Sequence, residues 1–242
     1  MPELDGLGLV REVKRTRPAL PVVLMTAKGS EDLAATALRV GAASYVPKRN
    51  LKSELPDTLR VVLDMAAQRK QRQQLLDILT VTESRFSLGY EPDAPAALVS
   101  YCQDALRMMR ICDATDVVRV GTALGEAVVN AVEHGNLELD SRLRETGNGG
   151  GYSELYRRRL KEPPYKGRRV EVVARLTRQE AVYVVRDEGP GFDPSSLPDP
   201  TDPESLMRPY GRGLMLIRTF MDEVTFNDRA NEITMVKRKA PG

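Results

Sequence analysis

Tryptophan is absent from this chain of 242 residues, histidine occurs once, cysteine occurs twice, and aromatic residues make up only 5% of the sequence. Two cysteines, Cys102 and Cys112, cannot form a disulfide framework, so we expect a cytoplasmic protein with both thiols in packing positions. The single histidine, His134, excludes a histidine-rich metal site and is expected to be structural or to lie at the edge of a phosphate site. No run approaches the roughly 18 apolar residues of a membrane-spanning helix, and the N-terminal residues lack an apolar signal core, so we expect neither membrane insertion nor secretion.

The charge of the chain is nearly balanced, with 36 basic and 34 acidic residues and a net charge of +2. A protein that coats nucleic acid is normally far more basic, so we expect no nucleic-acid partner. The hydrophobic fraction of 41% and the charged fraction of 29% are typical of a globular chain with a core. The length allows one or two domains.

Residues 1–66 predict an alternation of helices and short apolar strands. The run Pro21–Ala27 is almost continuously apolar, which is typical of a strand buried on both faces of a parallel sheet. The other predicted segments are a strand at 43–46 and helices at 6–17, 31–40 and 52–67. Two parallel strands cannot bury the apolar faces of these helices, so we expect a partial doubly wound segment.

Several features of this segment occur in the order of one known family. An Asp-Gly pair begins at Asp5 after an initial Met-Pro, Thr26 ends the first strand, and Tyr45 and Lys48 lie in and just after the second. This pattern resembles the second half of a response-regulator receiver domain. The resemblance implies that Thr26, Tyr45 and Lys48 are the switch hydroxyl, the switch aromatic residue and the phosphate-binding lysine.

The same resemblance places the phosphoacceptor aspartate upstream of Met1. We therefore expect residues 1–66 to be a truncated receiver-like segment that cannot be phosphorylated in the receiver manner. Asp5 is a poor substitute because it lies beyond the strand end, near the start of a helix. The alternative is an intact but degenerate small α/β module.

Residues 67–82 are rich in glutamine and basic side chains and predict a helical linker between two domains. A heptad seam can be traced through Leu55, Leu59, Val62, Ala66, Arg69, Gln73, Leu76 and Thr80. The middle of this seam is polar, so a coiled-coil homodimer and a solvated connecting helix are equal alternatives.

A second domain is predicted over residues 83–242. Strands are expected at 83–90, 169–176, 181–187, 223–227 and 231–238, and helices at 94–111, 115–133 and 213–221. This order predicts a two-layer α/β sandwich around a mixed sheet. Residues 137–168 form a polar, glycine-rich insert, for which a surface loop, an extra helix and a partner surface are the alternatives.

Glu126 and Asn130 lie four residues apart in one of these helices, so they project from the same face, with Glu133 close by. The opposite face is apolar and predicts packing in the core. A carboxylate beside a carboxamide oxygen suits a general base and a Mg²⁺ ligand at a phosphate site. Such a pair alone is common on exposed helices, so the prediction depends on the motifs that follow.

Two glycine motifs follow this helix in the sequence. Asp187 ends a strand, where a carboxylate can accept a hydrogen bond from a base amino group, and Gly189 and Gly191 let the backbone lie close to a flat ligand. Gly211 and Gly213 open a helix, whose free N–H groups and positive dipole end favour phosphate.

The order of the three motifs resembles the N, G1 and G2 boxes of the GHKL ATPases, a superfamily of gyrases, heat-shock chaperones, histidine kinases and mismatch-repair proteins. The resemblance implies a Bergerat-type ATP-binding fold over residues 83–238, with ATP and Mg²⁺ as cofactors. The residues it implies for cofactor binding are Asn130, Asp187, Gly189, Gly191, Gly211, Arg212, Gly213, Leu214 and Thr234. Residues 192–212 correspond to the ATP lid, with Arg208 and Arg212 near the phosphates.

Within that superfamily, the stretch Gly125–Asn136 is most similar to the anti-sigma-factor serine kinases. The similarity implies Glu126 as the base that acts on the substrate hydroxyl, Asn130 as the Mg²⁺ ligand and Asp187 as the reader of adenine, with Thr234 near the base. We therefore expect a serine/threonine protein kinase that is governed by a receiver and phosphorylates an anti-anti-sigma-like protein. A sigma factor is a further candidate partner.

Two other functions remain open from the sequence. One is an ATP-gated module that binds a partner without kinase activity, for which the long insert is the reason. The other is a histidine-kinase catalytic domain that acts in trans. Autophosphorylation of an acceptor histidine within the chain is excluded, because the only histidine lies inside the ATP-site motif.

Overall fold

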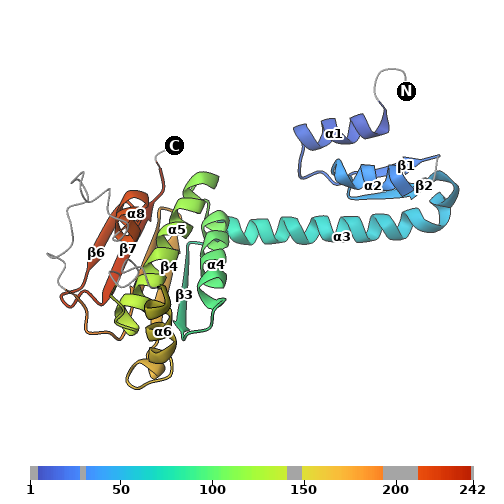
Figure 1. The fold of residues 1–242 in the computed structure, drawn as a ribbon. Helices are drawn as coiled ribbons and strands as arrows, with labels where there is room; N and C mark the ends of the chain where they lie inside the picture. Colours follow the sequence, from blue (N-terminus) through green and yellow to red (C-terminus); the bar gives the residue numbers. More distant parts are fainter. Residues whose placement is uncertain (1–4, 28–30, 141–148, 193–211, 241–242) are drawn as a thin grey trace. The chain divides into compact units, whose positions relative to one another are not determined.

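The computed structural model describes residues 5–27, 31–140, 149–192 and 212–240 (Figure 1). The chain divides into two compact units, Met1–Ile78 and Leu79–Gly242. This division falls inside the segment 67–82 that the sequence predicts as a linker, and most of that segment continues a helix of the first unit. Within the described ranges, no helix is long and apolar enough to cross a membrane.

The described residues of the first unit form two parallel strands, three α-helices and one 3₁₀ helix. Its elements are α1 Gly6–Thr16, β1 Val23–Thr26, α2 Glu31–Arg39, β2 Ser44–Pro47, the 3₁₀ helix η1 Lys48–Asn50 and α3 Leu51–Ile78. Asp5 caps α1 by accepting a hydrogen bond from the Gly8 N–H at 2.6 Å, which stabilises the helix start. The core is small, with Val10, Ala37 and Ala42 buried at its centre.

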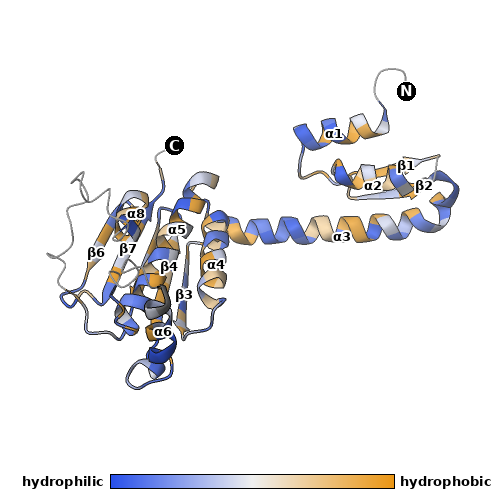
Figure 2. Cartoon of the chain, in the orientation of Figure 1, coloured by the Kyte–Doolittle hydropathy of each residue, from blue (hydrophilic) through white to orange (hydrophobic). Residues whose placement is uncertain are grey.

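Helix α3 packs against β2 through its first half, where Val62 is buried. Leu63 on the same helix is 58% exposed, so the unit covers only part of the helix surface. The second half of α3 is mostly hydrophilic (Figure 2). The seam position Val62 is therefore used within this unit, and the coiled-coil homodimer remains a prediction.

The second unit contains one five-stranded sheet, in the order β3-β4-β5-β7-β6. Its elements are β3 Val81–Leu88, α4 Ala94–Met109, α5 Ala114–Asn130, the π-helical turn η2 Ala131–Asn136, α6 Gly149–Arg159, the 3₁₀ helix η4 Tyr165–Gly167, β4 Val170–Thr177, β5 Glu180–Arg186, α8 Arg212–Phe220, β6 Glu223–Phe226 and β7 Glu232–Arg238. Every pairing in this sheet is antiparallel. The expectation of a mixed sheet is therefore wrong, because the β4–β5 and β6–β7 hairpins and the longer connections all place neighbouring strands in opposite directions.

The sheet is covered on one face by α4, α5 and α8 (Figure 1). Alternate residues of β4 and β5 point to this face and are buried, as period-two geometry requires. Leu106 of α4, Leu124 of α5 and Tyr183 of β5 are all fully buried there. Burying each leucine contributes about 1.5–3 kcal/mol, so the apolar stripes of α4 and α5 fix these helices on the sheet. The result is the predicted two-layer α/β sandwich.

Helix α5, which carries Glu126 and Asn130, has a side-chain cap at its start and a π-helical turn at its end. Asp113 is its N-cap and accepts a hydrogen bond from the Asp116 N–H at 2.8 Å. The α-helix ends at Asn130, earlier than the predicted end at Glu133, and continues as a π-helical turn to Asn136. Short π-helical segments are rare and are frequently found at functional sites.

The insert at 137–168 has structure of its own. It contains α6 and η4, and Leu137, Leu139 and Tyr152 form a small buried core with partly buried tyrosines around them. Of the alternatives for this segment, the extra helix is confirmed and the plain surface loop is wrong. The sequence left the choice open because the start of this helix is glycine-rich, whereas tertiary packing of Tyr152 holds the helix in place.

Candidate functional site

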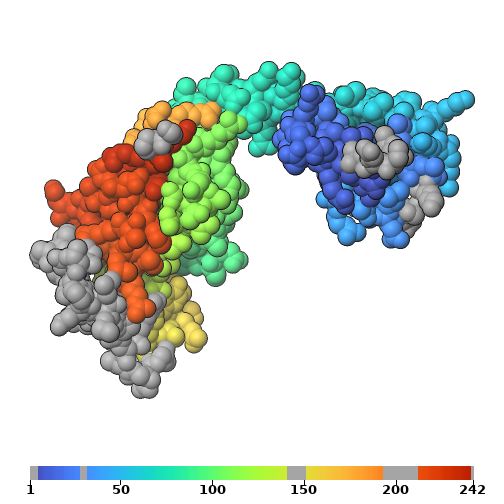
Figure 3. All heavy atoms as spheres, turned by 90° about the horizontal axis from the view of Figure 1, so that it is seen from above, coloured from blue at the N-terminus to red at the C-terminus, as the bar shows by residue number. Residues whose placement is uncertain are grey.

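The side chains of Glu126 and Asn130 lie against the first turn of α8. A Cβ atom added to Gly213 would lie 2.6 Å from Glu126 Oε2 and 3.4 Å from Asn130 Nδ2. Helices α5 and α8 are in contact, and Figure 3 shows the green surface that includes α5 directly beside the red C-terminal elements. Gly213 therefore lets a carboxylate and an amide reach the positive end of a helix.

Asp187 lies at a second close approach, between the end of β5 and the π-helical turn. A Cβ atom on Gly135 would overlap the Asp187 carboxylate, and one on Gly189 would overlap the Gly135 carbonyl. Gly191 has a φ of +81°, and a Cβ there would overlap the Arg229 carbonyl. Only glycine fits these three positions, because backbone meets backbone or carboxylate directly.

The Asp187 carboxylate is partly buried and accepts a hydrogen bond from the Gly189 N–H at 2.8 Å. Burial raises the pKa of Asp187 to about 6, and the Gly189 N–H and the charge of Arg168 partly offset that rise. The carboxylate is therefore ionised at neutral pH in a partly apolar setting, where it can accept a hydrogen bond from a ligand amino group.

A pocket of about 320 Å³ joins these two places. Asn130, His134, Asp187, Gly191, Gly213 and Leu214 line it, together with the apolar side chains of Phe192, Ile217, Phe226 and Ile233. Its volume and its apolar walls with a few convergent polar groups are typical of a small-molecule site. Asp187 and the close-packed glycines beside it suit a flat base that lies against the backbone. The N-terminus of α8 with Asn130 suits a phosphate and its cation.

The structure does not bring all predicted residues to this pocket. Thr234 on β7 is not among the lining residues, whereas Ile233 is. Ile233 and Met235 are buried against the helices, so alternation turns Thr234 to the other face of the sheet. Thr234 therefore does not line the pocket, whereas Ile233 does, and a position of Thr234 near the base stays a prediction.

The remaining predicted residues divide into three groups. Glu126 is not among the residues that line the pocket and lies against Gly213 instead. Arg212 is the exposed first residue of α8, and Gly189 supports Asp187 without lining the pocket. Gly211, Arg208 and the lid residues 193–211 lie outside the described residues.

His134 lies in the pocket wall, and its Nδ1 is 2.6 Å from the Leu139 carbonyl oxygen. In the described part of the chain, no three His, Cys, Asp or Glu side chains gather as a metal site. Cys102 is buried in the core, and burial raises the pKa of its thiol to about 12, so it is a packing residue as expected.

The receiver-like residues lie at the end of the first unit's sheet. Thr26 is buried at the end of β1, opposite Pro47, and Lys48 follows directly after β2. The carboxyl ends of parallel strands share one edge, so Thr26 and Lys48 occupy the edge where such sheets bind ligands. Tyr45 lies within β2 and is half-buried.

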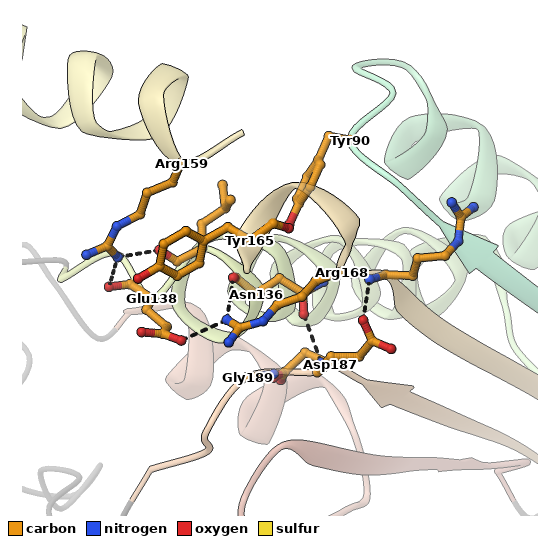
Figure 4. A network of polar contacts seen from close by, with 11 residues as sticks. Tyr90, Asn136, Glu138, Arg159, Tyr165, Arg168, Asp187 and Gly189 are labelled. Carbon is orange, nitrogen blue, oxygen red and sulfur yellow. Dashed lines mark hydrogen bonds and ion pairs between the residues drawn. The ribbon is translucent and has the colours of Figure 1, made fainter. Parts of the chain in front are cut away.

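Sequence reasoning missed a polar network that connects the insert to the turn at residues 187–189, here called the Asp187 turn (Figure 4). Asn136 Oδ1 accepts a hydrogen bond from the Glu188 N–H at 2.8 Å, and Arg168 Nη1 donates to the Asn136 carbonyl at 2.8 Å. Arg168 also pairs with Glu138 at 2.7 Å. No periodic pattern connects residues this far apart, so only the folded chain reveals the network.

Comparisons with known proteins agree with both units. Residues 90–237 match the family described as the histidine kinase-like ATPase domain, and residues 1–60 match the response regulator receiver domain. The DNA-binding transcriptional regulator NtrC of Klebsiella pneumoniae and that of Escherichia coli are each 46% identical over 48 residues, which is 20% of this chain and 10% of theirs. The transcriptional regulatory protein ZraR of Salmonella typhimurium is 27% identical over 134 residues, which is 55% of this chain and 28% of its own. The chain thus spans less than a third of the length of these relatives.

Proposed function

Because the chain belongs to the histidine kinase-like ATPase domain family, we propose that it is a serine/threonine protein kinase of the anti-sigma type, with ATP and Mg²⁺ as cofactors. Its proposed substrate is an anti-anti-sigma-like protein, and its receiver segment is the proposed regulatory input. The observation that carries the proposal is Glu126, whose carboxylate meets the α8 N-terminus beside Asn130. The nearly balanced charge of the chain supports a protein partner over nucleic acid.

Each residue of the site has a distinct part in this proposal. Asp187 accepts a hydrogen bond from the adenine amino group, and the first turn of α8 at Gly213 receives the phosphates. Asn130 offers its amide oxygen to Mg²⁺, which neutralises phosphate charge when bound. Glu126 takes the proton of the substrate hydroxyl, because it is the carboxylate closest to that phosphate-binding turn among the predicted site residues.

The test is transfer of γ-labelled phosphate from ATP to a candidate anti-anti-sigma-like protein. Acid-stable label is expected on a serine or threonine of that protein. Glu126→Gln should lower the transfer rate by about 100-fold or more and change ATP affinity only a few-fold, because a general base acts in the chemical step. Glu171→Gln is the matched control, since that exposed carboxylate lies on β4, away from the pocket.

The outcomes separate the proposed functions. ATP binding without label on the partner, or full transfer by Glu126→Gln, would contradict the kinase. Acid-labile label would indicate transfer to a histidine of another protein. His134 is the chain's single histidine, and it is held at the Leu139 carbonyl within the pocket wall, which argues against its use as an acceptor.

A second function, an ATP-gated partner-binding module, is favoured by the structured insert. The insert reaches the Asp187 turn through Asn136 and Arg168, so nucleotide binding and the insert surface share contacts. Partner affinity that depends on ATP but is unchanged by Glu126→Gln is the expected result for this module. Affinity that is indifferent to nucleotide would contradict it.

A further inference from the structure

We propose that Arg168 and Asn136 are positioning residues that hold the Asp187 turn and give the pocket its preference for adenine over bases with a carbonyl at the same position. This inference rests on the proposed nucleotide site. It gives the insert a specificity role, because Arg168 is the last residue of the segment 137–168.

The Asp187 turn is held from two sides. On the hairpin side, the Asp187 N–H donates to the Asn231 carbonyl at 3.0 Å, and Asn231 Nδ2 donates back to the Asp187 carbonyl at 3.0 Å. On the insert side, the Glu188 N–H donates to Asn136 Oδ1 at 2.8 Å, and Asn136 is fully buried. Asn136 therefore fixes the backbone directly after the carboxylate that faces the pocket.

Arg168 holds Asn136 in turn (Figure 4). Its Nη1 donates to the Asn136 carbonyl at 2.8 Å and to Glu138 Oε1 at 2.7 Å, and its side chain is only 17% exposed. Its guanidinium lies over the Tyr165 ring, 5.2 Å from the centroid. The Tyr165 backbone carbonyl accepts a hydrogen bond from the Tyr90 hydroxyl at 2.8 Å. The arginine is therefore pre-organised and offers a fixed positive charge to the turn.

Arg168 acts on Asp187 through its charge as well as through the hydrogen bonds that hold the turn. Burial raises the pKa of Asp187, and Arg168 opposes that rise and favours the ionised carboxylate. Among the described residues, the other charged or titratable groups near the turn or in the pocket wall are Arg186, Glu188, His134 and Glu232. Arg168 is thus the cation that favours an acceptor-only carboxylate at this place.

The protonation state of Asp187 decides which base is read. Adenine carries an amino donor where guanine carries a carbonyl acceptor. An ionised carboxylate accepts from the amino group and repels the carbonyl, whereas a protonated carboxyl donates to the carbonyl. ATP and inosine triphosphate (ITP) differ at this position and at the neighbouring ring nitrogen N1, which accepts a hydrogen bond in ATP and donates one in ITP. Their relative affinity therefore reports on the hydrogen bonds made at this edge of the base.

The experiment measures the dissociation constants of ATP and ITP for the full chain across roughly pH 5.5 to 8.5, a range that brackets the pKa of Asp187. The wild type should bind ATP more tightly than ITP at neutral pH, with the preference declining as pH falls through about 6. Arg168→Gln should move that midpoint upward by about one pH unit and weaken ATP binding at neutral pH, since the carboxylate loses a nearby cation. Arg168→Lys keeps the charge and loses the fork geometry, so its midpoint should stay near that of the wild type while ATP affinity falls.

Two further variants keep the experiment decisive. Glu138→Gln removes the anion paired with Arg168 and should move the midpoint in the opposite direction, to lower pH. Arg169→Gln is the matched control, because the guanidinium of that neighbouring arginine bonds to Ser87 on β3 instead of the turn. To separate any contribution of His134 in the pocket wall, the shift caused by Arg168→Gln should also appear in the His134→Gln background.

The outcomes distinguish the two levels of the argument. A wild type that binds neither nucleotide overturns the proposed function itself. A wild type that binds ATP, with Arg168→Gln and Glu138→Gln profiles that superimpose on that of Arg169→Gln, overturns this inference and leaves the nucleotide site standing. If Arg168→Gln does not fold, the direction of the Glu138→Gln shift decides.

Discussion

Asp187 is expected to weaken the fold at neutral pH while it serves the pocket. Burial is the main cause that raises the pKa of Asp187 to about 6 from an ordinary value of 3.8, so the folded chain opposes ionisation of this carboxylate. Asparagine has the same shape and keeps an oxygen for the Gly189 N–H, but carries no charge. Asp187→Asn should therefore be more stable than the wild type at neutral pH and should bind ATP less well.

The size and the pH window follow from the shift. A group whose folded pKa lies above its unfolded value contributes its stability in full below about pH 4, and loses it as pH rises through about 6. Roughly two pKa units correspond to about 3 kcal/mol as an upper value. Partial exposure of the carboxylate reduces this to about 1–2 kcal/mol through solvent screening. The melting temperature of Asp187→Asn should then exceed that of the wild type by about 2–8 °C above pH 7.

The assay is thermal and urea unfolding of both chains without nucleotide, from about pH 4 to about pH 8. The stability difference should be near zero at the acidic end and reach its full value by about pH 7. Asp228→Asn is the control, because it removes the same charge from an exposed position of the β6–β7 hairpin and should show no such pH dependence. An Asp187→Asn difference that is constant with pH, or a variant that is less stable above pH 7, would refute the reasoning.

Three other outcomes are expected. Gly213→Ala should weaken ATP binding about 10-fold or more, because the added Cβ would lie 2.6 Å from a carboxylate oxygen of α5, whereas Gly151→Ala, with open space around it, should leave binding unchanged in the same titration. The thiols should resist alkylation at about pH 8 in the folded chain, with Cys102 slower than Cys112 because burial raises their pKa values to about 12 and about 11, and equal rates before and after unfolding would contradict this. Asp113→Ala should lower the unfolding free energy by about 1 kcal/mol in urea titrations through loss of the α5 N-cap, and an unchanged midpoint would show that the cap is dispensable.

Local patterns in the sequence determined most of the secondary structure and the order of the site motifs. The apolar stripes of α4 and α5 and the alternation in β4 and β5 appear in neighbouring residues, so periodicity reveals them. The same holds for Glu126 and Asn130, which share a helix face because of their spacing. The glycines at Gly135, Gly189 and Gly213 were visible in the sequence, but the close contacts that require glycine at these positions were not.

Tertiary structure alone decided which distant segments meet. The overlap that a Cβ at Gly189 would make with Gly135, and the chain of contacts from Arg168 through Asn136 to Glu188, depend on packing between elements, which no local period records. The same is true of the antiparallel sheet and of Thr234. A strand's two faces exchange roles with a shift of a single residue, so only the register of β7 against β5 could place Ile233 at the pocket and turn Thr234 away.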